Sequence, residues 1–267
     1  MRRVALVTLA GTVLVVSVAH AATCGNDAGG YERWKAEFSA EARARGISGS
    51  ALTAFARTQY STRTIRADRS QRSFQLSLKQ FMAKRGASAI VQQGRRHKAN
   101  NRALLDAVER NYGVPSGPLV AIWGMETAFG SYMGNINILS SVATLAYDCR
   151  RSEFFTNHLY AALRLVERGW LSPDAIGAAH GEIGQTQFLA ANVIKYGVDG
   201  DGNGRVDLIR SRADAFASTA NFLRAHGWRR GGGYQPGQVN YGALRAWNAA
   251  TVYQQAIAII AARIDAD

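Results

Sequence analysis

The sequence predicts a mainly α-helical protein. Apolar residues make up 47% of the 267-residue chain, which is enough to bury a core. These residues recur at helical spacing in most segments, as Trp34, Phe38 and Ala42 do at i, i+4 and i+8. Runs in which apolar and polar residues alternate, the pattern typical of strands, are almost absent.

The expected helices follow one another with short turns between them. Gly46 ends the first, Ser50 caps the second, and Pro115 and Pro118 break the chain just before the central one. The expected helical ranges are 31–45, 51–57, 71–84, 87–96, 101–112, a central helix opening at 116 or 117, 138–147, 153–168, 188–196, 214–226, 241–247 and 251–264.

The first 21 residues predict export. A basic pair, Arg2-Arg3, precedes an almost wholly apolar run over 4–18, and Ala19-His20-Ala21 has the small-x-small pattern of a cleavage site. We interpret residues 1–21 as a cleaved signal peptide, because the apolar run is too short for a secure membrane span. The residues before Cys24 do not form a lipobox, so we expect no lipid anchor. No later segment is long and apolar enough to cross a bilayer, so we expect no integral membrane protein.

Two cysteines remain, Cys24 and Cys149. In an oxidising compartment an even number of cysteines permits one internal disulfide, and the alternative is two free thiols. A bridge between them would tie the new N-terminus to the core and contribute about 2–4 kcal/mol.

The net charge of +13 favours an acidic partner, such as nucleic acid, anionic lipid or anionic cell wall. The basic residues are scattered, and no zinc-ligand cysteine pairs or aromatic RNA-binding motif occur. We therefore expect no nucleic-acid partner.

One acidic residue, Glu126, follows the apolar run 120–125 in the central segment. Desolvation at the end of an apolar helix disfavours the charged carboxylate and raises its pKa. A carboxyl group that is protonated at neutral pH can donate its proton to a leaving oxygen. The alternative is an ordinary glutamate that faces water at a helix end.

A loop rich in Asp and Gly matches the front of an EF-hand. Oxygen ligands stand at positions 1, 3 and 5, which are Asp199, Asp201 and Asn203. Gly204 occupies position 6, but Arg210 stands at position 12, where an acid is usual. Asp214 can supply that carboxylate if the loop extends over 199–214. We expect a structural calcium ion; sodium or an ion-free turn are the alternatives.

Several further motifs occur in a fixed order: Asp68-Arg69-Ser70-Gln71, Tyr112-Gly113-Val114-Pro115, Ala121-Ile122-Trp123-Gly124-Met125-Glu126-Thr127, Arg150-Arg151-Ser152-Glu153-Phe154-Phe155 and Gly184-Gln185-Thr186-Gln187-Phe188. With these motifs the chain resembles the B-type lytic murein transglycosylases, glycoside hydrolase family 103, over about residues 31–264. Those enzymes are periplasmic and cut the glycan strands of peptidoglycan.

The resemblance implies a lysozyme-like α core with an EF-hand-like loop over 101–267, and a helical N-terminal part over 22–100. It implies that Glu126 is the lone catalytic acid and base, that no cofactor serves catalysis, and that peptidoglycan is the partner of a periplasmic monomer. The implied groove residues are Arg150, Arg151, Gln187, Asn248 and Tyr253. The implied calcium ligands are Asp199, Asp201, Asn203, Asp214 and the carbonyl of Arg205.

Two alternatives to a lytic transglycosylase remain open. A muramidase-type hydrolase needs a second carboxylate, for which Glu182 is the one candidate in a motif loop. A peptidoglycan-binding protein with an inactive site needs no acid at all. The chain also departs from the family pattern at Trp247, where a tyrosine is usual, and at Glu182, where a small residue is common.

Overall fold

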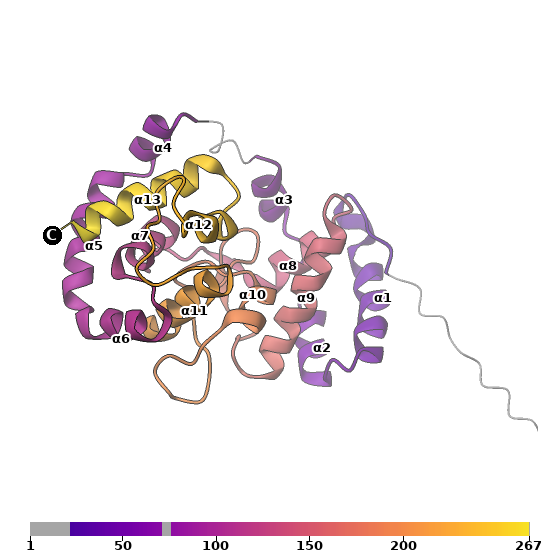
Figure 1. The fold of residues 1–267 in the computed structure, drawn as a ribbon. Helices are drawn as coiled ribbons and strands as arrows, with labels where there is room; N and C mark the ends of the chain where they lie inside the picture. The colour runs from indigo at the N-terminus through magenta and orange to yellow at the C-terminus, as the bar shows by residue number, and fades with distance from the viewer. Residues whose placement is uncertain (1–21, 71–75, 267) are drawn as a thin grey trace, which may run out of the picture.

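The computed structural model describes residues 22–70 and 76–266, so the expected signal peptide, residues 1–21, lies outside the described residues. The described residues form thirteen α-helices, one short 3-10 helix (Ala28–Gly30) and one two-stranded ladder (Figure 1). This confirms the mainly α fold. The helices are α1 (Tyr31–Ala44), α2 (Gly49–Ala56), α3 (Thr62–Arg69), α4 (Leu78–Lys84), α5 (Ala87–Asn100), α6 (Arg102–Tyr112), α7 (Ser116–Thr127), α8 (Ile138–Tyr147), α9 (Ser152–Glu167), α10 (Ala190–Tyr196), α11 (Arg212–Ala225), α12 (Tyr241–Trp247) and α13 (Thr251–Asp265). Among the described residues, no helix has the length and hydropathy needed to cross a membrane.

The central helix α7 is enclosed by other helices. It contacts α5, α6, α11 and α13, and Figure 1 shows it between them. All of its residues except Glu126 are buried, as expected for a helix that is apolar on every side. Two glycines let its neighbours approach. A Cβ at Gly117 would lie 2.5 Å from the carbonyl of Ala261 in α13, and one at Gly124 would lie 2.7 Å from Cγ2 of Ile90 in α5.

The N-terminal helices pack on the other side of the molecule. Helices α1 and α2 contact α8 and α9, and Trp34 stacks on Phe38 at a ring distance of 5.4 Å. A disulfide joins Cys24 to Cys149, which confirms that expectation. The amide of Cys149 also donates to the carbonyl of Gly25, so backbone pairing accompanies the covalent link.

The structure corrects the sequence analysis at several points. Helix α3 lies in a segment for which no helix was expected, and several expected helix ends are displaced by a few residues. Helix α2 begins at Gly49 and is capped by Ser48, because the hydroxyl of Ser48 rather than that of Ser50 accepts from the amide of Ala51. Helix α4 begins at Leu78, where Ser77 and Gln80 form a reciprocal capping box, so residues 76–77 are not helical, contrary to expectation, and residues 71–75 of the expected helix lie outside the described residues. A short antiparallel ladder, β1 (Ile136–Asn137) with β2 (Ile176–Gly177), was not expected, since two residues are too few to show a strand pattern.

The predicted division of the mature chain at 100/101 stays a prediction. Helices α4 and α5, which precede this point, contact α13, and α5 also contacts α7. The segments on the two sides of the division therefore pack against one another beside the central helix.

Candidate active site

Glu126 lies in the last turn of α7, and a loop from a distant part of the chain holds that turn. The hydroxyl of Thr127 donates to the carbonyl of Gln185 at 2.6 Å. The same hydroxyl accepts from the amide of Gly130 at 3.0 Å. One buried side chain thus fixes the end of α7 to the 184–187 loop and sets the position of Glu126.

The backbone around this turn is strained. In the part of the chain that the structure describes, the non-glycine residues with positive φ are Ala128 (47°), Phe129 (61°) and Gln187 (57°). Each such conformation costs on the order of 1 kcal/mol for an L-residue, and such residues concentrate at functional sites. Here they flank the two ends of the contact between α7 and the loop, which indicates a functional role for this junction.

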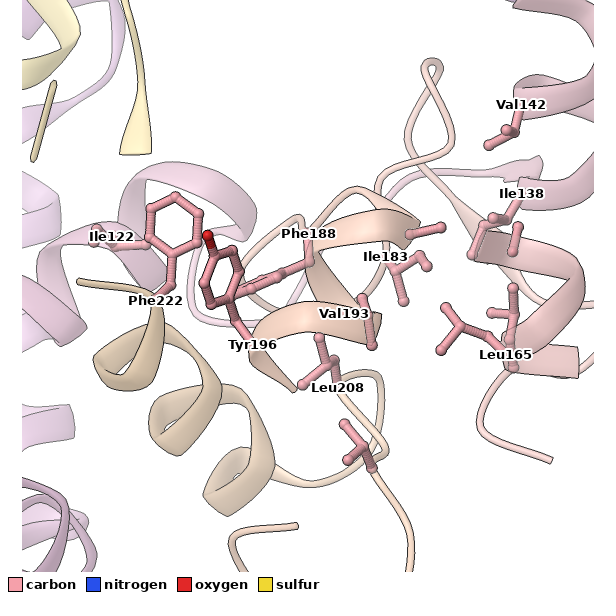
Figure 2. Packing of buried hydrophobic residues seen from close by; sticks show 14 of the residues in the cluster. Ile122, Ile138, Val142, Leu165, Ile183, Phe188, Val193, Tyr196, Leu208 and Phe222 are labelled. Atoms are coloured by element: carbon pink, nitrogen blue, oxygen red, sulfur yellow. The ribbon is translucent and has the colours of Figure 1, made fainter. Parts of the chain in front are cut away.

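The loop itself is anchored by its apolar residues. Ile183 and Phe188 exchange backbone hydrogen bonds of 2.7 and 3.1 Å, and both side chains are buried. Figure 2 shows both side chains within the cluster of buried hydrophobic residues, with Phe188 directed toward Tyr196. Because these anchors are buried and paired through their backbones, they place the polar residues beside them, Glu182 and Gln187, at the edge of the core.

Burial dominates the electrostatics of Glu126. It raises the pKa of this carboxyl from 4.5 to about 7. Hydrogen bonding by Tyr253 and by Trp247 acts in the opposite direction, as does the positive charge of Arg85, whereas the negative charge of Glu182 raises the pKa further. The indole Nε1 of Trp247 donates to Oε1 of Glu126 at 3.0 Å. A carboxyl group titrating near neutrality is suited to act first as an acid and then as a base.

Glu126 opens onto a cavity of about 240 Å³. The walls combine polar and aromatic side chains, which are Glu182, Gln187, Phe188, Leu189, Asn192, Phe222, Ala246, Trp247 and Asn248. A larger cavity, of about 610 Å³, lies beside Trp170 and Arg210, and Glu126 does not line it. The smaller cavity is the candidate active site because it contains the group suited to proton transfer.

Three of the expected groove residues meet around Glu126. Gln187 and Asn248 line the cavity, although the side-chain amide of Gln187 also donates to the carbonyl of Gly184 at 2.8 Å. Tyr253 is 2% exposed and lies against Glu126 rather than on the cavity wall. Tyr253 is therefore a hydrogen-bonding neighbour of the Glu126 carboxyl group.

The other two expected groove residues, Arg150 and Arg151, do not line the cavity. Both guanidinium groups donate to the carboxylate of Asp68, which is 2% exposed. The two arginine side chains remain 46% and 40% exposed, so each keeps a surface for an anionic ligand. Their roles in binding stay a prediction.

Sequence reasoning missed the partners of these groups. Trp247 was noted only as a departure from the family pattern, yet it donates to Glu126 from 121 residues away. Asp68 stood in a quoted motif, but nothing in the local sequence indicates that it is buried between two arginines. His180 had no signal at all; its ring lies between Asp68 and Glu182.

The Asp-Gly loop brings its acidic residues together. Ligand atoms of Asp199, Asp201 and Asp214 all lie within 4.8 Å of one another. Asp214 is fully buried at the start of α11, and its Oδ1 accepts from the amide of Gly200 at 2.9 Å. Gly204 has φ of 88°, the left-handed conformation that position 6 of an EF-hand loop requires. Three converging carboxylates in such a loop fit a hard cation with oxygen ligands.

The remaining two expected ligands also belong to this loop. The side-chain oxygen of Asn203 accepts from the amide of Arg205 at 3.1 Å. The guanidinium of Arg205 donates to Asp207 at 2.5 Å. A guanidinium is a cation without a free lone pair, so the carbonyl of Arg205 is the group that can bind a metal.

The sequence of this chain is similar to those of known transglycosylases. A family model described as the transglycosylase SLT domain matches residues 30–238. Membrane-bound lytic murein transglycosylase B of Escherichia coli (strain K12) is 37% identical over 122 residues, which cover 45% of this chain and 34% of the relative. The match thus spans about a third of that relative's length.

Solved structures show the same fold over most of the chain. SltB3 from Pseudomonas aeruginosa, in complex with NAG-anhNAM-pentapeptide, superposes with a TM-score of 0.82 at 30% identity and covers 88% of this chain and 80% of its own. The Escherichia coli lytic transglycosylase Slt35, crystallised in complex with calcium, superposes with a TM-score of 0.75 at 20% identity over 91% of this chain and 96% of its own. The lysozyme-like fold of these neighbours agrees with the expected fold class. The chain therefore belongs to the transglycosylase SLT domain family, and SltB3 and membrane-bound lytic murein transglycosylase B are among the proteins that it resembles.

Proposed function

We propose that this protein is a lytic transglycosylase that cleaves the β-1,4 bond between N-acetylmuramic acid and N-acetylglucosamine in peptidoglycan and leaves 1,6-anhydromuramoyl ends. The observation that carries the proposal is Glu126, a carboxyl group with a pKa of about 7 that opens onto the cavity. The complexes of SltB3 with NAG-anhNAM-pentapeptide and with NAG-NAM-pentapeptide support this choice of substrate.

In the first step, protonated Glu126 donates its proton to the glycosidic oxygen. The bond between this oxygen and C1 of the muramoyl residue breaks, and the N-acetylglucosamine side leaves with a new hydroxyl group. The carbonyl oxygen of the substrate's own acetamido group stabilises the positive charge that develops at C1. Glu126 becomes a carboxylate, which Trp247 stabilises by donating its N–H.

In the second step, the carboxylate of Glu126 accepts the proton of the C6 hydroxyl of the same muramoyl residue. The C6 oxygen attacks C1 and forms the 1,6-anhydro ring. Glu126 returns to its protonated form, and no water is consumed. One residue can serve both steps because its pKa of about 7 makes both protonation states accessible at neutral pH.

The state of Glu182 supports transglycosylation over hydrolysis. A hydrolase that activates water needs a general base with a pKa near the working pH. Burial raises the pKa of Glu182, but hydrogen bonding and charge from His180 outweigh this and lower it overall. Glu182 is therefore a weaker base than an ordinary glutamate, which favours a route in which the C6 hydroxyl rather than water is the nucleophile.

We propose calcium as a structural ion in the 199–214 loop, held by the carboxylates of Asp199, Asp201 and Asp214 with Asn203 and the carbonyl of Arg205. Their convergence within 4.8 Å and the calcium in the Slt35 crystal structure support this proposal. The ion would stiffen the loop and the start of α11, and no proton transfer passes through it.

We further propose that the protein acts in the periplasm as a monomer, after removal of residues 1–21. The n-region, apolar run and cleavage pattern support export. The disulfide fits an oxidising compartment. Removal of residues 1–21 takes away Arg2 and Arg3 and no acidic residue, so the net charge of +13 becomes 13 − 2 = +11, which would keep the protein near an anionic cell wall.

Digestion of purified murein by the wild type and by Glu126→Gln tests the proposal. Glutamine keeps the shape of the side chain and removes the acid. We expect the wild type to release anhydromuropeptides, seen by mass spectrometry, and the variant to release them at least about 1,000-fold more slowly. A variant that cleaves at the wild-type rate would refute the role of Glu126. A wild type that binds murein but releases nothing would indicate the binding protein instead.

A further inference from the structure

Glu182 is the second carboxylate of the cavity, and contacts to both of its oxygens fix its orientation. Its side chain is 23% exposed and lines the same walls as Glu126. The backbone amide of His180 donates to its Oε2 at 2.9 Å. Nδ1 of the His180 ring lies 3.2 Å from its Oε1. Both oxygens are therefore oriented by one neighbouring residue.

Further polar contacts hold His180 from the side away from the cavity. Nε2 of His180 lies 3.6 Å from Oδ1 of Asp68, so an acid faces each nitrogen of the ring. Asp68 is fixed in turn by the guanidinium groups of Arg150 and Arg151. A chain of charged and polar groups thus runs from two exposed arginines to the wall of the active site.

This arrangement suits a carboxylate that remains charged. Each carboxylate oxygen has two lone pairs, and His180 uses one on each, so both oxygens can still accept a hydrogen bond. The pKa of Glu182 is lowered, so this carboxylate is ionised at neutral pH. Its negative charge is one of the causes that raise the pKa of Glu126. When the surroundings of two acids move their pKa values apart in this way, the two acids have different roles.

We infer that Glu182 is a further catalytic residue, an anion that accepts a hydrogen bond from the acetamido N–H of the reacting muramoyl residue, with His180 and Asp68 as the residues that position it. The inference rests on the proposed function. No bond to Glu182 forms or breaks. Its hydrogen bond turns the acetamido carbonyl toward C1, and its negative charge stabilises the positive charge shared by C1 and the acetamido group in the transition state.

The charge of Glu182 also affects the pKa of Glu126. The charged and titratable groups around Glu182 are His180 on its own loop, Glu126 on α7, Arg151 before α9, and Asp68 on α3 through the imidazole. Of these, Glu126 changes its protonation during the reaction. Because the negative charge of Glu182 raises the pKa of Glu126, removing that charge should lower this pKa and shift the pH at which the acid form of Glu126 is lost.

Glu182→Gln tests both the hydrogen bond to the acetamido group and the effect on the pKa of Glu126. The substrate is soluble glycan strands, and the readout is the release of anhydromuropeptides. We expect kcat to fall on the order of 100-fold while KM changes less than about threefold, because the lost interaction acts mainly in the transition state. We also expect the descending limb of kcat/KM against pH to move to lower pH. The matched control is Glu109→Gln on α6, outside the cavity, which should leave both unchanged. A Glu182→Gln enzyme with wild-type kcat and an unmoved limb would overturn the inference.

Two further variants separate positioning from charge. Glu182→Asp keeps the charge and moves it, so kcat should fall while the pH limb stays in place; a kcat equal to that of the wild type would overturn the inference even if Glu182→Gln does not fold. His180→Gln should give a smaller fall in kcat in the same direction. The failure of the inference differs from that of the proposed function, because a wild type that releases reducing ends refutes the transglycosylase itself, whatever Glu182 does.

Discussion

The burial of Glu126 has a cost in stability that can be measured without any substrate. The folded protein holds this carboxyl at a pKa of about 7, against 4.5 for the ordinary group, so the folded state binds more protons than the unfolded state between these values. Stability therefore falls as the pH rises through this window. A difference of roughly 2.5 pH units corresponds to up to about 3 kcal/mol.

Glu126→Gln removes this titration and should not lose stability in the same window. We expect the free energy of unfolding of the variant, relative to the wild type, to increase by up to about 3 kcal/mol between pH 4.5 and 7 and to stay constant above about pH 8. Urea unfolding followed by circular dichroism at a series of pH values measures the difference, and Glu109→Gln corrects for the loss of one carboxylate. A difference that does not change with pH would refute a buried, destabilised acid at position 126.

Three other changes probe the supports of the site. Trp247→Phe removes the N–H donor to Oε1 of Glu126 and should move the descending limb of the pH–rate profile to higher pH by about one unit; a limb at lower pH would contradict this. Calcium at about 100 times its Kd should stabilise the wild type by about 2.7 kcal/mol, whereas Asp214→Asn should abolish most of this gain; equal melting temperatures with and without a chelator would argue against a bound ion. Replacing both Cys24 and Cys149 by serine should lower the free energy of unfolding by about 2–4 kcal/mol, and an unchanged urea midpoint would show that the bridge does not stabilise the fold.

The helices could be predicted because their signals are local. The apolar spacing and the flanking glycines and prolines place α8 and α12 at the same residues as the structure does. Where two capping residues compete, the pattern is ambiguous: Ser48 and Ser50 both suit an N-cap, and only the backbone decides that Ser48 fills the role. The disulfide could be predicted from the expected oxidising compartment and the even number of cysteines, without knowledge of the fold.

The site was only partly predictable because its residues come from distant segments. Glu126 is marked by its own neighbours, since an acid at the end of an apolar helix is unusual. The groups that tune it are not marked, because Trp247 and Tyr253 reach it only after α12 and α13 pack near α7. Likewise, the pairing of Arg150 with Asp68 joins residues 82 apart, and no local pattern reveals that contact.

The fate of water during cleavage tests the proposed reaction of Glu126 most directly. Murein is digested by the wild type in heavy-oxygen water, and the muramoyl ends are analysed by mass spectrometry. We expect ends that are one water lighter than hydrolysed ends and that carry no heavy oxygen, because the C6 hydroxyl closes on C1. Reducing ends labelled with heavy oxygen would contradict this reaction, since they would require a base that activates water in this cavity.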